Sequence, residues 1–146
     1  MNGAFKYWQS NLAELESSYP YTAKDGTCQY KATSGKVNTK SYSTVTANNI
    51  SQLQAAVNKG PVSIAIEADQ LVFQNYKSGI LADNGKCGTS LDHGVLVVGY
   101  DSASSYVIVK NSWGASWGES GYIRLGYGST SSGACGFLAQ PSYPTL

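Results

Sequence analysis

The single histidine, His93, and the asparagine at position 111 are the residues whose types and spacing could do chemistry together. Imidazole can accept and return a proton near neutral pH, and a protonated imidazole draws a nearby thiol toward the reactive thiolate. An amide oxygen that accepts from the imidazole N–H would fix the ring's tautomer without adding a full negative charge. A lone histidine is more often structural, and an Asn in a turn more often satisfies its own backbone. The secondary-structure elements around the two residues must therefore decide between a catalytic and a structural role.

The elements that would position this pair are two apolar segments in succession. His93 begins a Val-rich strand predicted over residues 93–100, and Asn111 follows a second strand predicted over residues 106–110. Because a short polar link joins the two segments, they should pair and bring both side chains to one end of a sheet. Trp113 could cover the hydrogen bond from water and could also simply fill the core, since these two roles are compatible.

The remaining pattern predicts a short helical start that leads into a mostly antiparallel, barrel-like sheet. In residues 62–66, Val and Ile alternate with Ser63, Ala65 and then Glu67, which predicts one buried and one exposed face. Helices are expected over residues 1–12, over residues 49–57 with Asn49 as the cap, and for one turn over residues 71–76. Further strands are expected over residues 36–45 and 121–126.

Length and charge exclude several classes of protein. The chain has 146 residues, which is one domain's worth and enough for a real core. Ten Lys and Arg against nine Asp and Glu, with no basic run, argue against nucleic acid or a membrane surface as the main partner. No apolar run approaches the ~20 residues of a membrane span, and no signal peptide is visible. The low charge and abundant Gly and Tyr favour an extracytoplasmic, β-rich protein.

The cysteine count is odd. With Cys28, Cys87 and Cys135, an oxidising compartment would leave a free thiol, an intermolecular bond or a missing partner. Cys87 lies six residues before His93 and is an alternative nucleophile, but its Gly-Lys-Cys-Gly setting offers no identifiable oxyanion donors. A zinc site from the three cysteines and His93 is less favoured, because no Cys-x-x-Cys pair is present. We expect no metal and no cofactor.

Most of the chain resembles a papain-like cysteine peptidase, the family of papain and the lysosomal cathepsins. Asn111 lies in a specific string, Lys-Asn-Ser-Trp-Gly, with a second Trp-Gly at Trp117-Gly118. Other matching segments follow in family order: Ser18-Tyr19-Pro20-Tyr21, Asp25-Gly26-Thr27-Cys28, Gly60-Pro61-Val62-Ser63-Ile64-Ala65-Ile66, Tyr76-Lys77-Ser78-Gly79-Ile80, Asp92-His93-Gly94, Gly121-Tyr122-Ile123-Arg124, Cys135-Gly136 and Ser142-Tyr143-Pro144-Thr145.

This resemblance implies a role for each member of the pair. His93 is implied as the general base, Asn111 as its orienter and Trp113 as the flanking indole. The family's nucleophilic string, Cys-Gly-(Ser/Ala)-Cys-(Trp/Tyr), does not occur in the chain, and neither does the oxyanion-hole Gln ahead of it. Because the family's His and Asn follow that Cys by ~130–150 residues, the nucleophile would lie ~40–60 residues before Met1. We therefore expect a chain cut inside its first helix, which has no N-cap residue.

The resemblance also implies a sulfur pairing and a substrate pocket. Cys87 and Cys135 resemble a bonded pair, whereas the partner of Cys28 would lie in the absent part. The main side-chain pocket would be formed by Met1, Ala65, Leu91, Asp92 and Gln140, and its apolar members would favour a bulky apolar side chain.

The expected fold is α+β and papain-like. Residues 1–35 would be the remnant of the helical (left) domain, and residues 36–146 the antiparallel β-barrel (right) domain that carries His93 and Asn111. The family hydrolyses peptide bonds through an acyl-thioester, but this chain alone should be inactive. The alternatives are a non-catalytic peptide- or protein-binding homologue, or an inactive fragment of an incomplete gene model. Expected partners are polypeptide substrates and protein inhibitors, in a lysosome or vacuole or outside the cell.

Overall fold

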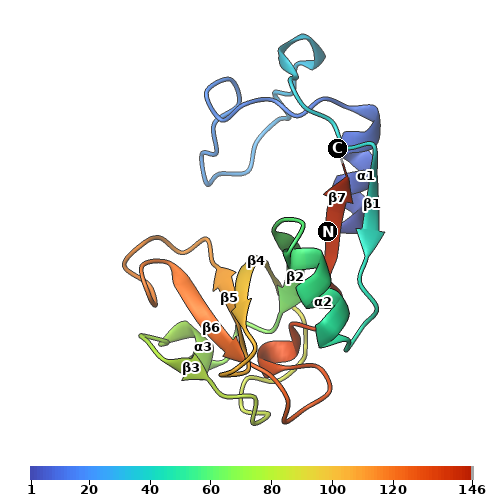
Figure 1. Cartoon of the computed structure of the whole chain (residues 1–146). Helices are drawn as coiled ribbons and strands as arrows, with labels where there is room; N and C mark the ends of the chain where they lie inside the picture. The colour runs from blue at the N-terminus through green and yellow to red at the C-terminus, as the bar shows by residue number, and fades with distance from the viewer. Residues whose placement is uncertain (146) are drawn as a thin grey trace. The chain divides into compact units, whose positions relative to one another are not determined.

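The computed structural model describes residues 1–145 and separates into two compact units (Figure 1). The larger unit comprises Thr44–Tyr143 together with Met1, and the smaller one Asn2–Ser43 together with Pro144 and Thr145. Helices and strands are both present, so the expected α+β class is confirmed. Each unit is described by itself below.

A seven-stranded sheet runs in the order β1-β7-β2-β4-β5-β6-β3. The pairings β2–β4, β4–β5, β5–β6 and β2–β7 are antiparallel, while β3 pairs with β6 in parallel. The strands are β1 (Ser41–Thr44), β2 (Val62–Ile66), β3 (Ile80–Leu81), β4 (His93–Asp101), β5 (Tyr106–Lys110), β6 (Tyr122–Gly126) and β7 (Ser142–Thr145). The sequence predicts a barrel-like sheet; because β1 and β3 lie at its two edges, the observed sheet is not closed into a barrel.

The core of the larger unit is formed by alternate residues of its central strands. In β2, Val62, Ile64 and Ile66 are buried while Ser63 and Ala65 are half-exposed, which is the predicted alternation. The valines of β4 and β5 follow the same period, and Phe73 and Phe137 fill the space beside them with no exposed surface. One apolar face of the sheet therefore forms the centre of this core, and residues from helices and loops complete it.

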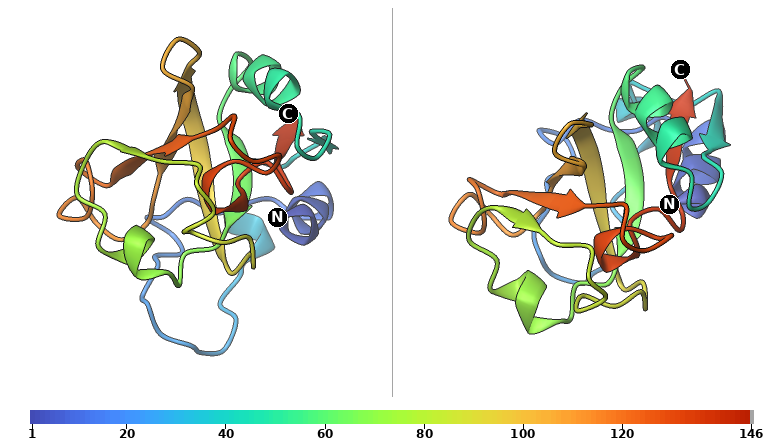
Figure 2. Two further views of the ribbon diagram at one scale, coloured as in Figure 1. Left: turned by 90° about the horizontal axis from the view of Figure 1, so that it is seen from below. Right: turned by 60° about the horizontal axis from the view of Figure 1, so that its bottom comes forward.

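Helix α2 (Ile50–Val57) lies beside β2 (Figure 2). Its Leu53 and Ala56 are buried and belong to this core. It begins as predicted at Asn49, whose side-chain oxygen accepts the Gln52 N–H at 3.0 Å. Such a cap satisfies one of the backbone donors that a helix leaves free at its first turn. The predicted turn after Gln70 is the short helix α3 (Leu71–Gln74).

The smaller unit has regular structure but almost no core. Helix α1 (Asn2–Ser10), predicted over residues 1–12, has no buried side chain. Its aromatic residues contact one another at the surface, as in the edge-to-face pair of Tyr7 and Trp8 at 4.8 Å between ring centroids. Thr39, the buried residue of this unit, donates to the Phe5 carbonyl from its side chain and to the Trp8 carbonyl from its backbone.

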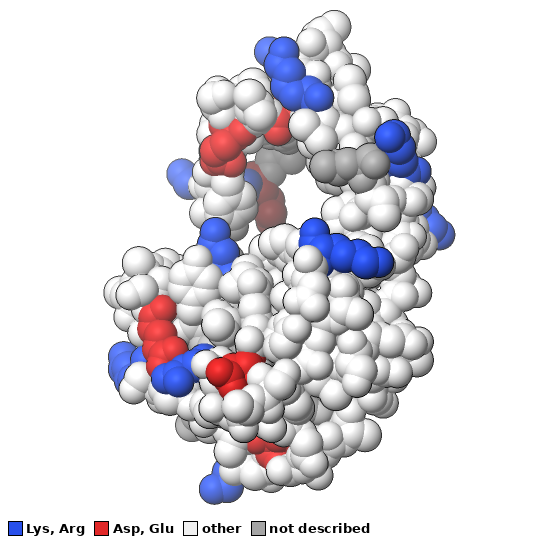
Figure 3. All heavy atoms as spheres, in the orientation of Figure 1, with Lys and Arg blue, Asp and Glu red and all other residues white. Residues whose placement is uncertain are grey.

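Structure outside the predicted elements consists of short pieces. The strands β3 and β7 and the two 3₁₀ turns at Ala32–Ser34 and Ala134–Gly136 were not anticipated. Positive and negative side chains are scattered over the face shown in Figure 3, without a patch of one sign. Within residues 1–145, no helix is long and apolar enough to cross a bilayer.

Candidate active site

The register of β4 and β5 places His93 and Asn111 on one face of the sheet. Val97 pairs with Val109, so their side chains point to the same side. Stepping by two along β4 reaches His93, and stepping by two beyond Val109 reaches Asn111. Both are therefore the last members of rows whose other members face the core. They lie where those rows reach the end of the sheet.

At that end, the two side chains meet. The His93 Nε2 and the Asn111 Oδ1 are 2.9 Å apart, which is hydrogen-bond distance. Asn111 is buried, with 8% of its surface exposed, while His93 is half-buried. The imidazole is thus fixed at one nitrogen by a buried partner.

The orientation of the Asn111 amide is determined by a backbone donor. The Ser112 N–H donates to the same Oδ1 at 2.8 Å, so this atom must be the amide oxygen. Because an amide oxygen can only accept, the His93 Nε2 must carry the hydrogen of the pair. A neutral His93 then has its lone pair on Nδ1, which is the nitrogen able to accept a proton.

Aromatic rings enclose the pair on one side. The rings of Trp113 and His93 are 5.3 Å apart between centroids and inclined by 31°. Behind Trp113, Phe73 and Trp117 pack at 5.4 Å each, and the Trp117 indole N–H donates to the Gln74 carbonyl at 3.0 Å. The indole of Trp113 itself remains 40% exposed, so it covers the imidazole without sealing it from solvent.

The loop that carries these indoles is held at its far end by an ion pair. Arg124 donates to Glu119 through Nε at 2.9 Å and through its terminal nitrogen at 2.6 Å. The Gly79 N–H donates to the same carboxylate. The hydrogen bond from Arg124 lowers the pKa of Glu119, with the Gly79 N–H acting in the same direction. Burial raises the pKa of Tyr76, whose hydroxyl donates to the Gly79 carbonyl at 2.5 Å.

Comparison with known proteins identifies the family. The family model described as "Papain family cysteine protease" matches residues 1–145. The chain belongs to the papain family of cysteine proteases. A thiol protease of Hemerocallis is 46% identical over 99% of this chain and 41% of its own length. The cysteine proteinase RD21A of Arabidopsis thaliana is also 46% identical, over 99% of this chain and 32% of its own length.

Solved structures of the papain family have the same fold. A cysteine protease of Carica candamarcensis in complex with E-64 matches with a TM-score of 0.87 and 40% identity, over 97% of this chain and 66% of that one. A digestive procathepsin L2 from Tenebrio molitor larval midgut gives a TM-score of 0.88 and 34% identity, over 100% of this chain and 47% of its own. The expected papain-like fold is confirmed. The chain spans 41–43% of the length of the first curated relatives it matches.

The residues predicted to form the papain-family substrate pocket lie in several segments of the chain. A hollow of about 400 Å³ on the sheet is lined by Met1, together with Gly94 and Asn111. The Met1 side chain lies against Gly94, since a β-carbon there would approach its terminal methyl to 3.1 Å. Gly94 pairs with Ala65, which places Ala65 next to this hollow.

The other predicted pocket residues make different contacts. The Asp92 carboxylate accepts the Ala68 N–H at 2.8 Å, and Leu91 packs beside Gly136. Gln140 is exposed in the segment that precedes β7. Of the predicted set, Met1 lines this hollow. Sequence reasoning assigned none of its other lining residues to a pocket: Ser63, Gly94, Val95, Leu96, Lys110, Asn111 and Ser112.

The cysteines take the expected states. Cys87 and Cys135 form a disulfide across a separation of 48 residues, which confirms the predicted pair. Cys28 is free and exposed, in the smaller unit. Within the larger unit, both sulfurs are therefore already bonded, and no group of metal-ligating side chains gathers among residues 1–145.

Glu67 is buried, although the sequence predicted that it would be exposed. Glu67 was expected on the exposed face of the second strand, yet only 6% of its surface is exposed. The alternation ends with β2 at Ile66, and the loop at Gly88–Ser90 covers the next residue. The burial of Glu67 is therefore caused by a loop that is distant in sequence, and the periodicity of one strand cannot predict such a contact.

Proposed function

We propose that this chain supplies the general base and its orienting amide to a papain-like cysteine endopeptidase, with the nucleophilic cysteine supplied from outside its 146 residues. The observation that carries the proposal is the 2.9 Å hydrogen bond between the His93 Nε2 and the Asn111 Oδ1. It leaves Nδ1 as the basic nitrogen of a ring whose tautomer is fixed.

The proposed chemistry assigns one role to each residue. His93 Nδ1 takes the proton of a cysteine thiol, and the thiolate attacks the scissile carbonyl carbon. The same imidazolium then protonates the departing amine, leaving an acyl-thioester that water hydrolyses. Asn111 holds the ring and accepts from its N–H throughout, and Trp113 limits the access of water to that hydrogen bond.

The proposed absence of a nucleophile rests on the sulfur chemistry of the larger unit. A disulfide sulfur has no thiolate form, and both cysteines in the unit that holds His93 are in the disulfide. The family's nucleophilic string is also missing from the sequence. We infer that the isolated chain is inactive, and that residues 1–35 and 36–146 represent the end of the helical half and the β-rich half of the complete enzyme.

Substrates, partners and location are part of the same proposal. The apolar side chain of Met1 against Gly94 supports a preference for a bulky apolar residue in the peptide, with Ala65, Leu91, Asp92 and Gln140 as further pocket residues. Polypeptides are the proposed substrates and protein inhibitors the proposed partners. The disulfide supports an oxidising location, either a lysosome or vacuole or the outside of the cell.

Complementation tests this function directly. The 146-residue chain is assayed with a fluorogenic peptide under reducing conditions, alone and fused to an N-terminal segment that bears the family's nucleophilic string. We expect no turnover from the chain alone and measurable turnover from the fusion. In the fusion, His93→Ala should reduce kcat/KM by about 10³-fold or more, and Asn111→Ala by less, because it acts through the imidazole.

Three results would contradict the proposal. Turnover by the isolated chain that disappears in a Cys87→Ala or Cys28→Ala variant would place the nucleophile within it. A fusion that binds peptides but does not turn over would favour the non-catalytic binding homologue. A chain that neither folds nor binds would favour the inactive fragment. The variant Cys28→Ser, which removes the free thiol, serves as the matched control and should retain the fusion's activity.

A further inference from the structure

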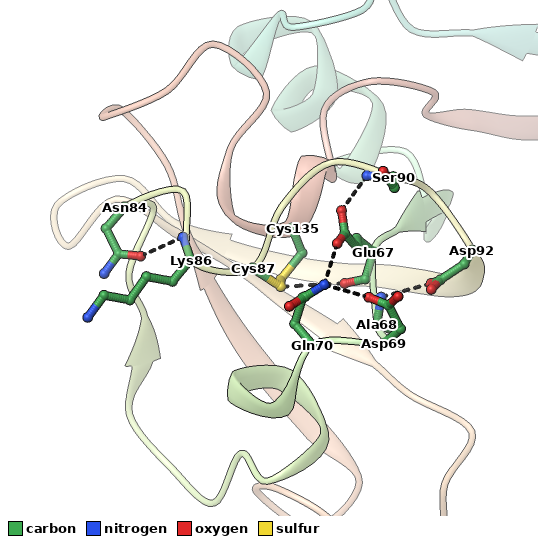
Figure 4. The surroundings of a disulfide bond; sticks show 10 residues. All are labelled: Glu67, Ala68, Asp69, Gln70, Asn84, Lys86, Cys87, Ser90, Asp92 and Cys135. Carbon is green, nitrogen blue, oxygen red and sulfur yellow. Dashed lines mark hydrogen bonds between the residues drawn. A yellow bond between two sulfur atoms is a disulfide. The ribbon is translucent and has the colours of Figure 1, made fainter.

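Glu67 is a buried carboxylate at the junction of three segments that are distant in sequence. It directly follows β2, and 6% of its surface is exposed. Figure 4 shows it between the disulfide and the loop that leads to Asp92. A buried carboxylate without compensating hydrogen bonds destabilises a fold strongly. Its position therefore needs a physical explanation.

The hydrogen bonds of Glu67 connect these three segments. Its carboxylate accepts the Ser90 N–H and, at 2.8 Å, a side-chain N–H of Gln70. Its backbone N–H donates to the Cys135 carbonyl at 2.9 Å. The Cys87 sulfur lies 3.4 Å from its carbonyl oxygen; a disulfide sulfur carries no hydrogen, so this is a packing contact. One residue thus contacts both sides of the disulfide and the loop after it.

The loop is shaped to receive this carboxylate. Gly88 has φ of +75°, and a β-carbon at that position would overlap the Glu67 carboxylate. Only glycine permits both this backbone conformation and the close approach. In Figure 4 the Lys86 side chain points away from the carboxylate, so backbone and amide donors, rather than a cation, satisfy the charge.

The same loop ends at the proposed catalytic base. Ser90, held by Glu67, is three residues before His93. Asp92 is held in addition by its N–H to the Ile66 carbonyl at 2.9 Å and by its carboxylate to the Ala68 N–H at 2.8 Å. Glu67 and its neighbours Ile66 and Ala68 therefore make the contacts that fix the residues just before His93 in the sequence.

We propose that Glu67 is a positioning residue for His93: its buried carboxylate holds the 88–90 loop so that the imidazole meets the Asn111 amide. The inference rests on the proposed role of His93 as base, because only then does its position matter for chemistry. A merely structural Glu67 would stabilise the larger unit while leaving the imidazole of the folded state unchanged.

The single histidine makes the test specific. In protein labelled with ¹⁵N-histidine, every imidazole signal belongs to His93. The full chain is compared with Glu67→Leu, which removes the acceptor, and with Glu67→Gln, which keeps one acceptor oxygen and loses the charge. Asp69→Asn is the matched control, since Asp69 is exposed and its carboxylate accepts from the same Gln70 side chain.

The readout is the native-state tautomer of the ring and the exchange rate of its Nε2–H. We expect Glu67→Leu to mix the tautomers and to speed exchange of that hydrogen about tenfold or more, since hydrogen bonds to charged groups are the strong ones. Glu67→Gln should give a smaller change in the same direction, and Asp69→Asn none. If Glu67→Leu does not fold, the comparison of Glu67→Gln with Asp69→Asn decides.

Two outcomes overturn the inference. Ring signals that stay at wild-type positions and exchange rates in the folded Glu67 variants would reduce Glu67 to a structural residue. An equal change in Asp69→Asn would mean that the loss of any negative charge in this region alters the ring, and that the Glu67 contacts have no special part. Neither outcome depends on peptide hydrolysis, so failure of this inference is distinguishable from failure of the proposed function.

Discussion

The two units of this chain contain similar sequence patterns but very different interiors. All the buried hydrophobic residues of positions 1–145 lie between Val45 and Leu138, in the larger unit. In the smaller unit, α1 has apolar residues at helical spacing and yet buries none of its side chains. Amphipathic spacing makes burial possible, but burial itself needs a second apolar surface to pack against. The unit that carries His93 and Asn111 has such a surface within itself.

The largest expected difference between the units comes from matched truncations of phenylalanine. Phe137→Ala, at a fully buried position, should lower the free energy of unfolding by about 3–5 kcal/mol because it leaves a cavity. Phe5→Ala, at a half-buried position of α1, should cost only about 1 kcal/mol. Urea unfolding with residue-resolved hydrogen exchange measures both changes. Equal losses would show that the smaller unit has a core of its own.

The second-largest expected difference between the units comes from replacing their cysteines. The double variant Cys87→Ala, Cys135→Ala opens a link across 48 residues and should cost about 2–4 kcal/mol. Cys28→Ser, in the smaller unit, should leave the free energy of unfolding unchanged because its thiol is exposed and free. Thiol titration of the folded, unreduced chain should find one reactive thiol. A count of three would contradict the disulfide.

A smaller effect is expected at the start of α2. Asn49→Ala removes the acceptor for the Gln52 N–H and should cost about 1 kcal/mol. Asn49→Asp keeps an oxygen in the same place and should restore most of that loss. Chemical denaturation of both variants provides the measurement. An alanine variant as stable as the aspartate variant would mean that core packing, not the cap, determines where α2 begins.

The smallest expected effect is the acid dependence of the Glu119–Arg124 pair. Because Arg124 lowers the pKa of Glu119 in the folded state, the pair stabilises the fold above the ordinary pKa of a glutamate. That contribution is lost as the pH falls through the lowered value. Because 33% of the Arg124 side chain and 28% of the Glu119 side chain are exposed, water screens the pair and its contribution should be small.

Glu119→Gln should therefore flatten the difference in unfolding free energy between neutral and acidic pH. Glu14→Gln is the control in the smaller unit, because within residues 1–145 Glu14 accepts a backbone N–H but forms no ion pair. A pH dependence altered equally by both variants would show that the Glu119–Arg124 pair has no special part in acid stability.

Local pattern was sufficient wherever the partner of a residue lies in the same or the adjacent element. The alternation in β2, the cap at Asn49, and the strands that bring His93 and Asn111 to one end of the sheet could all be predicted. Each depends on side-chain period or on hydrogen bonds a few residues apart, which are properties of the sequence itself.

Contacts between distant segments were decided only by the tertiary structure. Glu67 continues an alternation that predicts exposure, yet the 88–90 loop buries it. The Asp92 carboxylate accepts the Ala68 N–H, a contact that no local pattern indicates. The sheet also stays open, because β3, which pairs with β6, lies at its edge. In each case the deciding partner lies about twenty or more residues away, where sequence periodicity carries no information and only the folded chain determines which groups meet.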